Sequence, residues 1–259
     1  MQRHAERVSR SALHARLARL GGIGLLRARS GIAAIEFALI APIMIAACAG
    51  LYDLTTAFLA LQRVNMAALA IDQILTFQAA ADTLTNTNIL DLPEVQTATS
   101  AIYAYLPGTM TAPTSSFGVV VTSVVVTLQN TSCTSACTYV PNVAWSGLYQ
   151  GAAGSLRPCG ANALTWVADT TTSSSTALPI DLQPPQANPQ PPQPMLVVDV
   201  YYTYTPLFFT FVTGNIIMMR SAYFPPRTGL QSDWVQYYPG GSSDNTQQCA
   251  GYPWSTVNP

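Results

Sequence analysis

A run of apolar residues near the start of the chain most strongly restricts how the chain can fold. Residues 32–52 read IAAIEFALIAPIMIAACAGLY, and Glu36 is the only charged residue among these 21 positions. An α-helix rises about 1.5 Å per residue, so this run would extend about 31 Å, close to the thickness of the hydrocarbon core of a bilayer. We therefore predict a transmembrane helix over residues 32–53.

Charges on the two sides of this run predict its orientation. Residues 1–30 hold seven arginines and one acid, whereas residues 31–259 hold four arginines and eleven acids. The cytoplasmic flanks of membrane spans are enriched in basic residues. We therefore expect residues 1–31 to form a basic cytoplasmic leader and the acidic remainder to be exported. An acidic exported domain also argues against nucleic-acid binding.

Glu36 is an unusual residue for a membrane span. An ionised carboxylate there costs about 3 kcal/mol, so such a group normally has a partner. Cleavage after Gly31 would give Ile32 a free α-amino group with a pKa of about 8, mostly protonated and able to neutralise Glu36 of a neighbouring subunit. The spacing of Gly31, Glu36 and Phe37 before the apolar run thus predicts leader cleavage after Gly31 and a carboxylate that acts in assembly.

The helix is expected to continue beyond the span. No Gly or Pro interrupts residues 51–92, and apolar residues recur at spacings of three, four and seven. This pattern predicts an amphipathic extension over residues 54–82, packed on the exported domain. Its apolar stripe is Leu54, Phe58, Leu61, Ala68, Ile71 and Leu75, and Arg63, Asn65, Asp72 and Gln73 fill the other faces. Pro42 predicts a kink within the span.

Residues 83–227 are predicted to form the exported domain. Asp91, Pro93 and Glu94 predict the start of a helix over 91–106. The β-branched run Phe117–Gln129 predicts a buried strand, paired as a hairpin with a second strand over Thr138–Trp145. Pro141 places that second strand at an edge or a bulge.

The later part of this domain is predicted to alternate between strands and loops. Met195–Thr205 has a strand pattern, with Asp199 on the face opposite the apolar one. Residues 206–219 are too short for a second span and are expected to pack against the long helix. Residues 220–227 predict a last strand. A Pro-rich insert over 183–194 and a polar C-terminal tail over 228–259 complete an α+β architecture, a long helix packed on a small antiparallel sheet.

The cysteines fit an oxidising compartment. Cys48 lies in the span, and the four others lie in the exported part. Four cysteines allow three pairings, of which we favour Cys133–Cys137 and Cys159–Cys249. A four-cysteine zinc site is the alternative. The CxxxC spacing has no matching second pair and no His is available, so we predict no metal.

The residue types present argue against catalysis. From residue 31 onward the chain contains neither His nor Lys. This excludes a Ser–His–Asp or Cys–His site, a His-ligated zinc, a Schiff-base Lys and a P-loop Lys. We therefore expect a non-enzymatic protein without a cofactor.

Three stretches carry a resemblance to a known family. Residues 29–39 (RSGIAAIEFAL) with Pro42, residues 197–207 (VVDVYYTYTPL) and residues 220–227 (RSAYFPPR) resemble the TadE/TadG-like minor pseudopilins of the tight-adherence (Flp-type) pilus system. The resemblance covers residues 29–145 and 195–227, and the N-terminal motif is its most specific part. The 30-residue leader, the Pro-rich insert and the polar tail depart from the family pattern.

The resemblance implies a site and a set of partners. A prepilin-type peptidase would cut between Gly31 and Ile32, and Glu36 would be the assembly carboxylate. The partners would be that peptidase, other pilin and pseudopilin subunits and the inner-membrane assembly platform. The chain would lie in the bacterial inner membrane, with a cytoplasmic N-terminus and a periplasmic, pilin-like domain.

A rival interpretation concerns the end of the span. Residues 45–48 (IAAC) resemble a lipobox, which would attach lipid to Cys48 and leave an anchored envelope binding module outside any pilus. The second alternative is the same envelope binding module held in the membrane by the span alone, without lipid. Two features argue against the lipobox: the charge of Glu36 just before the apolar segment that would precede it, and the amphipathic helix that continues past Cys48.

Overall fold

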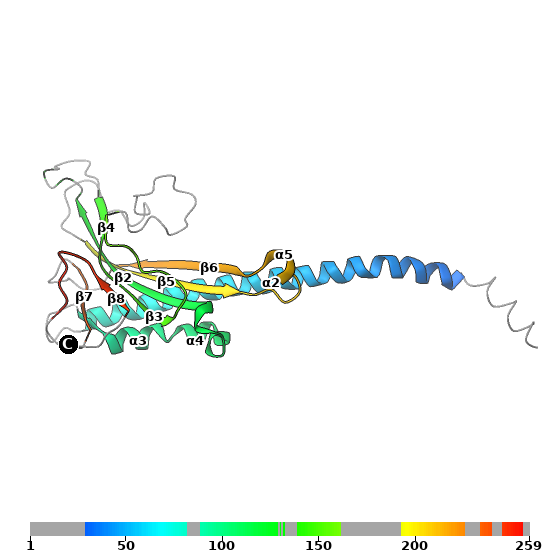
Figure 1. The fold of residues 1–259 in the computed structure, drawn as a ribbon, viewed down its shortest axis with the longest axis horizontal. Coiled ribbons are helices and arrows are strands. Elements are labelled where there is room, and N and C mark those ends of the chain that lie inside the picture. Colours follow the sequence, from blue (N-terminus) through cyan, green and yellow to red (C-terminus); the bar gives the residue numbers. More distant parts are fainter. Residues whose placement is uncertain are drawn as a thin grey trace, which may run out of the picture. The chain divides into compact units, whose positions relative to one another are not determined.

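The structure is a computed structural model that describes residues 29–81, 89–128, 130, 132, 139–161, 193–225, 234–239 and 245–255. It combines a long, apolar N-terminal helix with an antiparallel sheet, as expected (Figure 1). Internal contacts divide the chain into two units, residues 1–54 and residues 55–259, and each is described by itself below.

The long helix, α2, spans Arg29–Ala81 without interruption. These bounds agree with the helix predicted over residues 32–53 and its extension over residues 54–82. In the first unit, the placed side chains from residue 34 onward are mostly exposed. Pro42 lies inside the helix, which remains continuous there. A kink at this residue stays a prediction.

In the second unit, one face of α2 is buried against the domain. Its buried apolar side chains are Val64, Ala67, Ala68, Ile71, Leu75 and Ala79. Two parts of the predicted stripe are wrong. Leu54 and Phe58 are exposed, and Asp72, expected on another face, is fully buried. In the second unit, the buried apolar positions of α2 begin at Val64, the first residue of the helix in the hydrophobic core.

A short strand and a broken helix follow. Strand β1 spans Ile89–Asp91, and α3 spans Leu92–Thr99. Asp91 caps α3 as predicted: its carboxylate accepts from the Glu94 amide at 2.7 Å, and the Glu94 carboxylate accepts from the Asp91 amide at 3.1 Å. The helix predicted over 91–106 is interrupted at Ser100 and Ala101, and its second half is the separate short helix α4, Ile102–Tyr105.

The helix breaks after Thr99. The Thr99 hydroxyl donates to the Val95 carbonyl and the Ser100 hydroxyl donates to the Thr97 carbonyl. Such bonds compete with helical hydrogen bonding. The chain then forms α4 over Ile102–Tyr105 and the 3-10 helices η1, Pro107–Met110, and η2, Thr114–Ser116.

The main sheet is antiparallel, with strand order β4-β3-β2-β5-β6, and β8 also pairs with β3. Its strands are β2 (Phe117–Leu128), β3 (Tyr139–Gly151), β4 (Gly160–Ala161), β5 (Gln193–Tyr204), β6 (Ile216–Phe224) and β8 (Thr246–Gln248). The predicted hairpin between the first two long strands is confirmed. Of the predicted Pro-rich insert, only Gln193 and Pro194 are described, and they open β5.

Strand β3 corrects one expectation. It continues to Gly151, six residues beyond the predicted end at Trp145, and it is not an edge strand. Strands β4 and β8 pair along its outer side between Asn142 and Gly147, and Pro141 lies just outside these pairings. The other alternative predicted from Pro141, a bulge in this strand, is consistent with the pairing to β2. The pairing with β2 shifts register near Ala144, where the ladder is irregular.

The segment over 206–219 also differs from expectation. It forms the turn of the β5–β6 hairpin, with the short helix α5 over Thr210–Thr213. Strand β6 begins at Ile216, four residues before the predicted strand, because Ile216 pairs with Tyr204 of β5. Leu207, Phe208 and Ile217 are exposed and Pro206 is buried, and packing of this segment against the long helix stays a prediction.

Residues predicted as a polar tail belong to the domain, so that prediction is wrong. Strand β7, Gln236–Tyr238, pairs in parallel with β1, and β8 joins the main sheet. Val235 and Tyr237 are fully buried. The Trp145 indole donates to the Val235 carbonyl at 2.7 Å. A few large apolar side chains bury enough surface to fold a segment that is otherwise polar.

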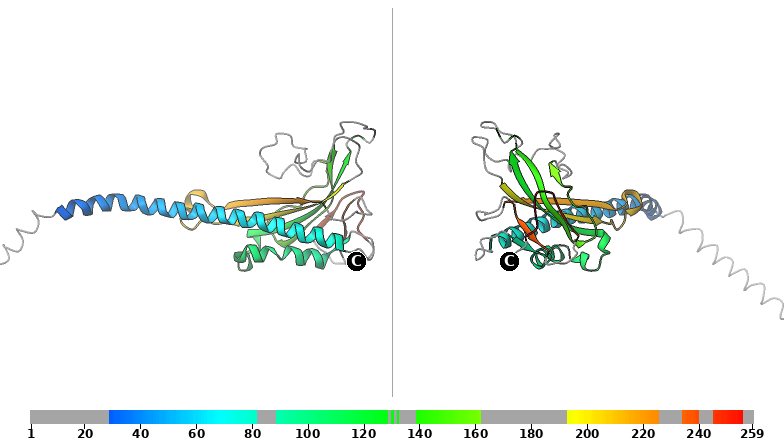
Figure 2. Two further views of the ribbon diagram at one scale, coloured as in Figure 1. Left: turned by 180° about the vertical axis from the view of Figure 1, so that it is seen from behind. Right: turned by 60° about the vertical axis from the view of Figure 1, so that its left-hand side comes forward.

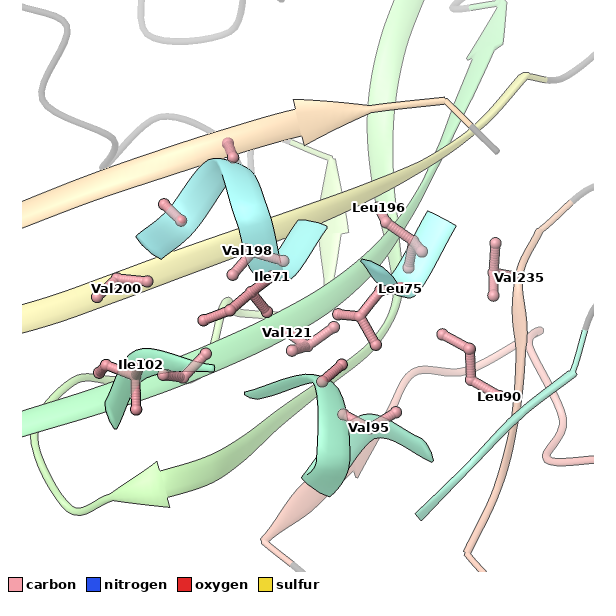
Figure 3. Close-up of a cluster of buried hydrophobic side chains, with 14 of the residues drawn as sticks. Ile71, Leu75, Leu90, Val95, Ile102, Val121, Leu196, Val198, Val200 and Val235 are labelled. Carbon is pink, nitrogen blue, oxygen red and sulfur yellow. The ribbon is translucent and has the colours of Figure 1, made fainter. Parts of the chain in front are cut away.

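The core lies between one face of the sheet and the helices α2, α3 and α4, which lie on the same side of it (Figure 2). Figure 3 shows Ile71 and Leu75 of α2 beside Val121 of β2 and Val198 of β5. The other face of β2 and β5 is also buried, around Val124, Val126, Val143, Met195, Val197 and Cys249. Burial on both faces explains the uninterrupted apolar sequence of β2.

Candidate functional site

The first unit presents an apolar helical surface. Helix α2 contains a segment long and apolar enough to cross a membrane, and the side chains of its most apolar window are not buried within the structure. Ile35, Phe37, Leu39 and Ile43 are among the exposed large side chains. A water-exposed surface of this kind is unfavourable, and a bilayer or other apolar helices would cover it.

Glu36 lies on this surface. Its side chain is exposed, and among the described residues it has neither an ion pair nor a hydrogen bond. Gly31 and Ile32, the predicted cleavage position, lie in the first turns of α2. The helix therefore holds a carboxylate among apolar side chains and offers it no counter-charge from the described part of the same chain. A counter-charge for the Glu36 carboxylate would have to come from another group.

Cys48 also lies on the exposed surface of α2, as a free cysteine. The helix is continuous through it. Its thiol is thus accessible on the surface of the apolar helix. The helix does not end at this residue.

Cys159 and Cys249 form a disulfide with a Cα–Cα distance of 5.4 Å, the pairing favoured from the sequence. It joins the segment after β3 to the segment after β8. Disulfides persist in oxidising compartments, so this bond is compatible with an exported domain. Cys133 and Cys137, the other predicted pair, lie outside the described residues.

Arg157, two residues before Cys159, belongs to a buried ion pair. Arg157 and Asp199 are both fully buried. The Arg157 Nε and Nη2 atoms each donate to one Asp199 carboxylate oxygen at 2.7 Å, a bidentate arrangement. The Ser221 hydroxyl also donates to Asp199, and the Arg157 guanidinium lies 6.0 Å from the ring centre of Tyr223.

The environment of Arg157 favours the charged form of its guanidinium. Burial by itself lowers the pKa of the Arg157 guanidinium, but the Asp199 carboxylate, with Tyr223 adding, leaves that pKa above its ordinary value. The Arg157 amide donates to the Ser146 hydroxyl at 3.0 Å, which fixes the loop after β3 to the strand before it. These bonds fasten the loop that carries Cys159 onto β3 and β5.

Asp72 is a second buried acid. Neither carboxylate oxygen has a hydrogen-bond partner in the described part of the chain. Asp72 lies on the domain-packed part of α2, well past the predicted span. Burial, with the charge of Asp199 adding, raises the pKa of its carboxyl well above the ordinary value. The helix–sheet interface thus holds an acid that resists ionisation.

Among the described residues, no three His, Cys, Asp or Glu side chains gather as a metal site requires. A groove of about 410 Å³ lies between α2 and α4, lined by Ala70, Gln73, Ile74, Phe77 and Tyr105. Its lining is mostly apolar and has no acid–base pair.

The sequence pointed to some of these groups and missed others. The span, Glu36 and the cysteines were predicted from local pattern, whereas Arg157 was not singled out. Its partner Asp199 is 42 residues away, and no spacing links them. An acid in the middle of an apolar strand, as in Val197–Val200, was the one available signal.

Comparison of the chain with protein-family models, with curated proteins and with solved structures gives no match. The function proposed next therefore stands on the residues described above and on the resemblance of the N-terminal motif.

Proposed function

We propose that the chain is a non-enzymatic, TadE/TadG-like minor pseudopilin that helps to assemble a tight-adherence (Flp-type) pilus. The observation that carries this proposal is Glu36, an exposed carboxylate without a partner among the described residues, on an exposed apolar helix. A lone ionised acid in lipid is costly, so it favours helices that supply a counter-charge.

A counter-charge is available if the leader is removed. Cleavage between Gly31 and Ile32 creates an α-amino group, and on a neighbouring subunit that amine would pair with Glu36 as the apolar helices come together. The peptidase would be of the prepilin type. The other partners would be pilin and pseudopilin subunits and the inner-membrane assembly platform.

The exported part supports the same role. The second half of α2 packs on an antiparallel sheet, an arrangement that resembles a pilin-like domain on its helical stem. The Cys159–Cys249 disulfide is compatible with the periplasm. The chain would be a single-pass inner-membrane protein with a cytoplasmic N-terminus, and it would enter or assist the pilus.

Mass spectrometry of the membrane-extracted protein tests the processing step. We expect a mature chain that begins at Ile32. A chain that begins with lipid-modified Cys48 would instead support an anchored binding module, and an intact Met1 would support an unprocessed single-pass module. The exposure of Cys48 is the observation that favours the lipid-anchored alternative.

A charge-removing substitution tests the assembly step. Glu36→Gln should insert at least as well as the natural chain, because it removes a charge from the span. It should nevertheless fail to restore piliation in a deletion strain. Glu94→Gln, the same change at the α3 cap, is the matched control and should restore it. Normal piliation with Glu36→Gln would contradict the proposed role of the carboxylate.

A further inference from the structure

Strand β6 forms one end of the main sheet. It pairs with β5 along its whole length, and no strand in the described part of the chain pairs with its other side (Figure 1). Alternate residues of such an edge strand direct their backbone N–H and C=O groups away from the sheet. The nine residues of β6 therefore offer the backbone groups of about four residues to an added strand.

The two ends of the sheet differ in how they are protected from such pairing. Beyond β3 the strands are short, since β4 has two residues and β8 has three. Strand β6 is long, its register with β5 has no shift, and no proline interrupts it. Natural edge strands are usually protected by short length, bulges, prolines or charges. Of these devices, β6 has only one charged residue, Arg220.

Arg220 is the central residue of β6, and its side chain is exposed. It pairs with Val200 of β5, whose side chain is buried on the α2 side of the sheet, so Arg220 lies on that side as well. Among the described residues its guanidinium forms no ion pair, and it donates to the Met219 carbonyl of its own strand at 3.1 Å. The centre of the open edge therefore carries a positive charge that no described acid neutralises.

A second unpaired cation lies on the same side of the sheet. Tyr202 is two residues from Val200 along β5 and shares its face. Burial, with Tyr204 adding, raises the pKa of Tyr202, and the nearby charge of Arg63 of α2 opposes this increase. Arg63 is exposed, and it too has no ion pair within the described ranges. This side of the sheet thus favours an acidic partner.

We propose that β6 binds an extended, acidic segment of another protein, which adds as a strand along the open edge with a carboxylate opposite Arg220. Backbone hydrogen bonds supply the affinity in such strand addition, and side-chain pairs across the strands supply the specificity. This inference goes beyond the proposed function and does not depend on it.

A second copy of this chain fits the edge less well. Because Arg220 is the central residue of β6, full antiparallel pairing of two β6 strands would place one Arg220 directly opposite the other. Like charges in opposite positions destabilise a pair of strands. A strand with an acid at that position gains an attraction instead.

Synthetic peptides test strand addition to the full chain in detergent, with the Cys159–Cys249 disulfide intact. The acidic peptide is Thr-Val-Thr-Val-Glu-Val-Thr-Val-Thr, with a fluorescein label for anisotropy measurements of affinity. One control peptide has Lys in place of Glu. The other keeps Glu but carries N-methyl groups on the amides of its three central residues, which prevent backbone hydrogen bonding there. Hydrogen exchange followed by mass spectrometry locates the binding site.

We expect the acidic peptide to bind about tenfold more tightly than the Lys peptide and to slow amide exchange within residues 216–224. The N-methylated peptide should not bind. Arg220→Glu should reverse the preference between the acidic and the Lys peptide. Gln247→Glu is the matched control, because it introduces the same charge at an exposed residue of β8, and it should leave the preference unchanged.

Three results would overturn this inference. Equal binding of the acidic and the N-methylated peptide would show attraction by charge without strand addition. Unchanged amide exchange over residues 216–224, with peptide concentrations up to about 1 mM to detect weak binding, would show that the edge accepts no strand. Protection of β6 that increases with protein concentration, without peptide, would identify a second copy of the chain as the occupant.

Discussion

The buried ion pair between Arg157 and Asp199 makes a quantitative prediction about stability. Substitution Arg157→Met removes both 2.7 Å hydrogen bonds to the carboxylate and keeps much of the side-chain volume. Asp199 then remains fully buried without a counter-charge. Removal of one partner from a buried pair typically costs about 3–5 kcal/mol of unfolding free energy.

The surroundings of Asp199 narrow this range. The Ser221 hydroxyl still donates to the carboxylate, and a hydrogen bond to a charged group contributes about 1.5–3 kcal/mol. We therefore expect a loss near the lower limit, about 3 kcal/mol. A second variant, Arg157→Met with Asp199→Leu, removes both charges. It leaves the Ser221 hydroxyl without its acceptor and Tyr223 without its interaction with Arg157. Its loss should be about 1 kcal/mol.

Urea unfolding of the full chain in detergent measures these losses. Tryptophan fluorescence is a suitable signal because Trp145 is buried and its indole donates to the Val235 carbonyl. The exposed Arg220 supplies the control, and Arg220→Met should change the unfolding free energy by less than about 0.5 kcal/mol. A loss below about 1 kcal/mol for Arg157→Met, or a double variant as unstable as the single one, would refute the reasoning.

Three further predictions concern other parts of the domain. Because the pKa of Asp72 is raised in the folded state, its contribution to stability should be largest below the ordinary carboxyl pKa and should fall as pH rises from there through the folded pKa. Asp72→Asn should remove this contribution from urea midpoints measured across pH, and an unchanged pH slope would contradict it. Cys159→Ser removes a disulfide that closes 90 residues and should lower the unfolding free energy by about 2–4 kcal/mol. Reductant added to the natural chain should cause the same loss, whereas reductant added to the variant should cause no further loss from this bond. Gly118→Ala would place a Cβ 1.8 Å from the Ala153 carbonyl oxygen, whereas Gly108→Ala meets nothing within 4 Å; only the first should lower the thermal midpoint, and equal midpoints would show that the loop yields freely.

Local pattern predicted much of the architecture. The absence of Gly and Pro over residues 51–92 predicted that α2 continues past the span, and it runs to Ala81. The Asp91 and Glu94 pair predicted the start of α3, and β-branched residues predicted β2. Each of these signals consists of residues close together in the sequence, and such residues determine local backbone conformation and helix capping.

Other features depend on contacts between distant residues. The C-terminal segment was predicted to be a polar tail, but Val235 and Tyr237 are buried in the core. The average composition of the segment did not predict their burial, because that burial depends on contacts with β1 and β3. The same limit applies to Asp72, whose burial is decided by how α2 rotates onto the sheet.

By itself, the sequence determined the apolar helical segment with its one acid, the unbroken helix and the long strands, since each depends on residues that are neighbours along the chain. Only the tertiary structure decided that Arg157 meets Asp199, that Asp72 is sealed from water and that the β5–β6 turn exposes Leu207 and Ile217. The physical reason is that burial and ion pairing depend on which surfaces fold against each other, and residues far apart in sequence supply the two sides of every such contact.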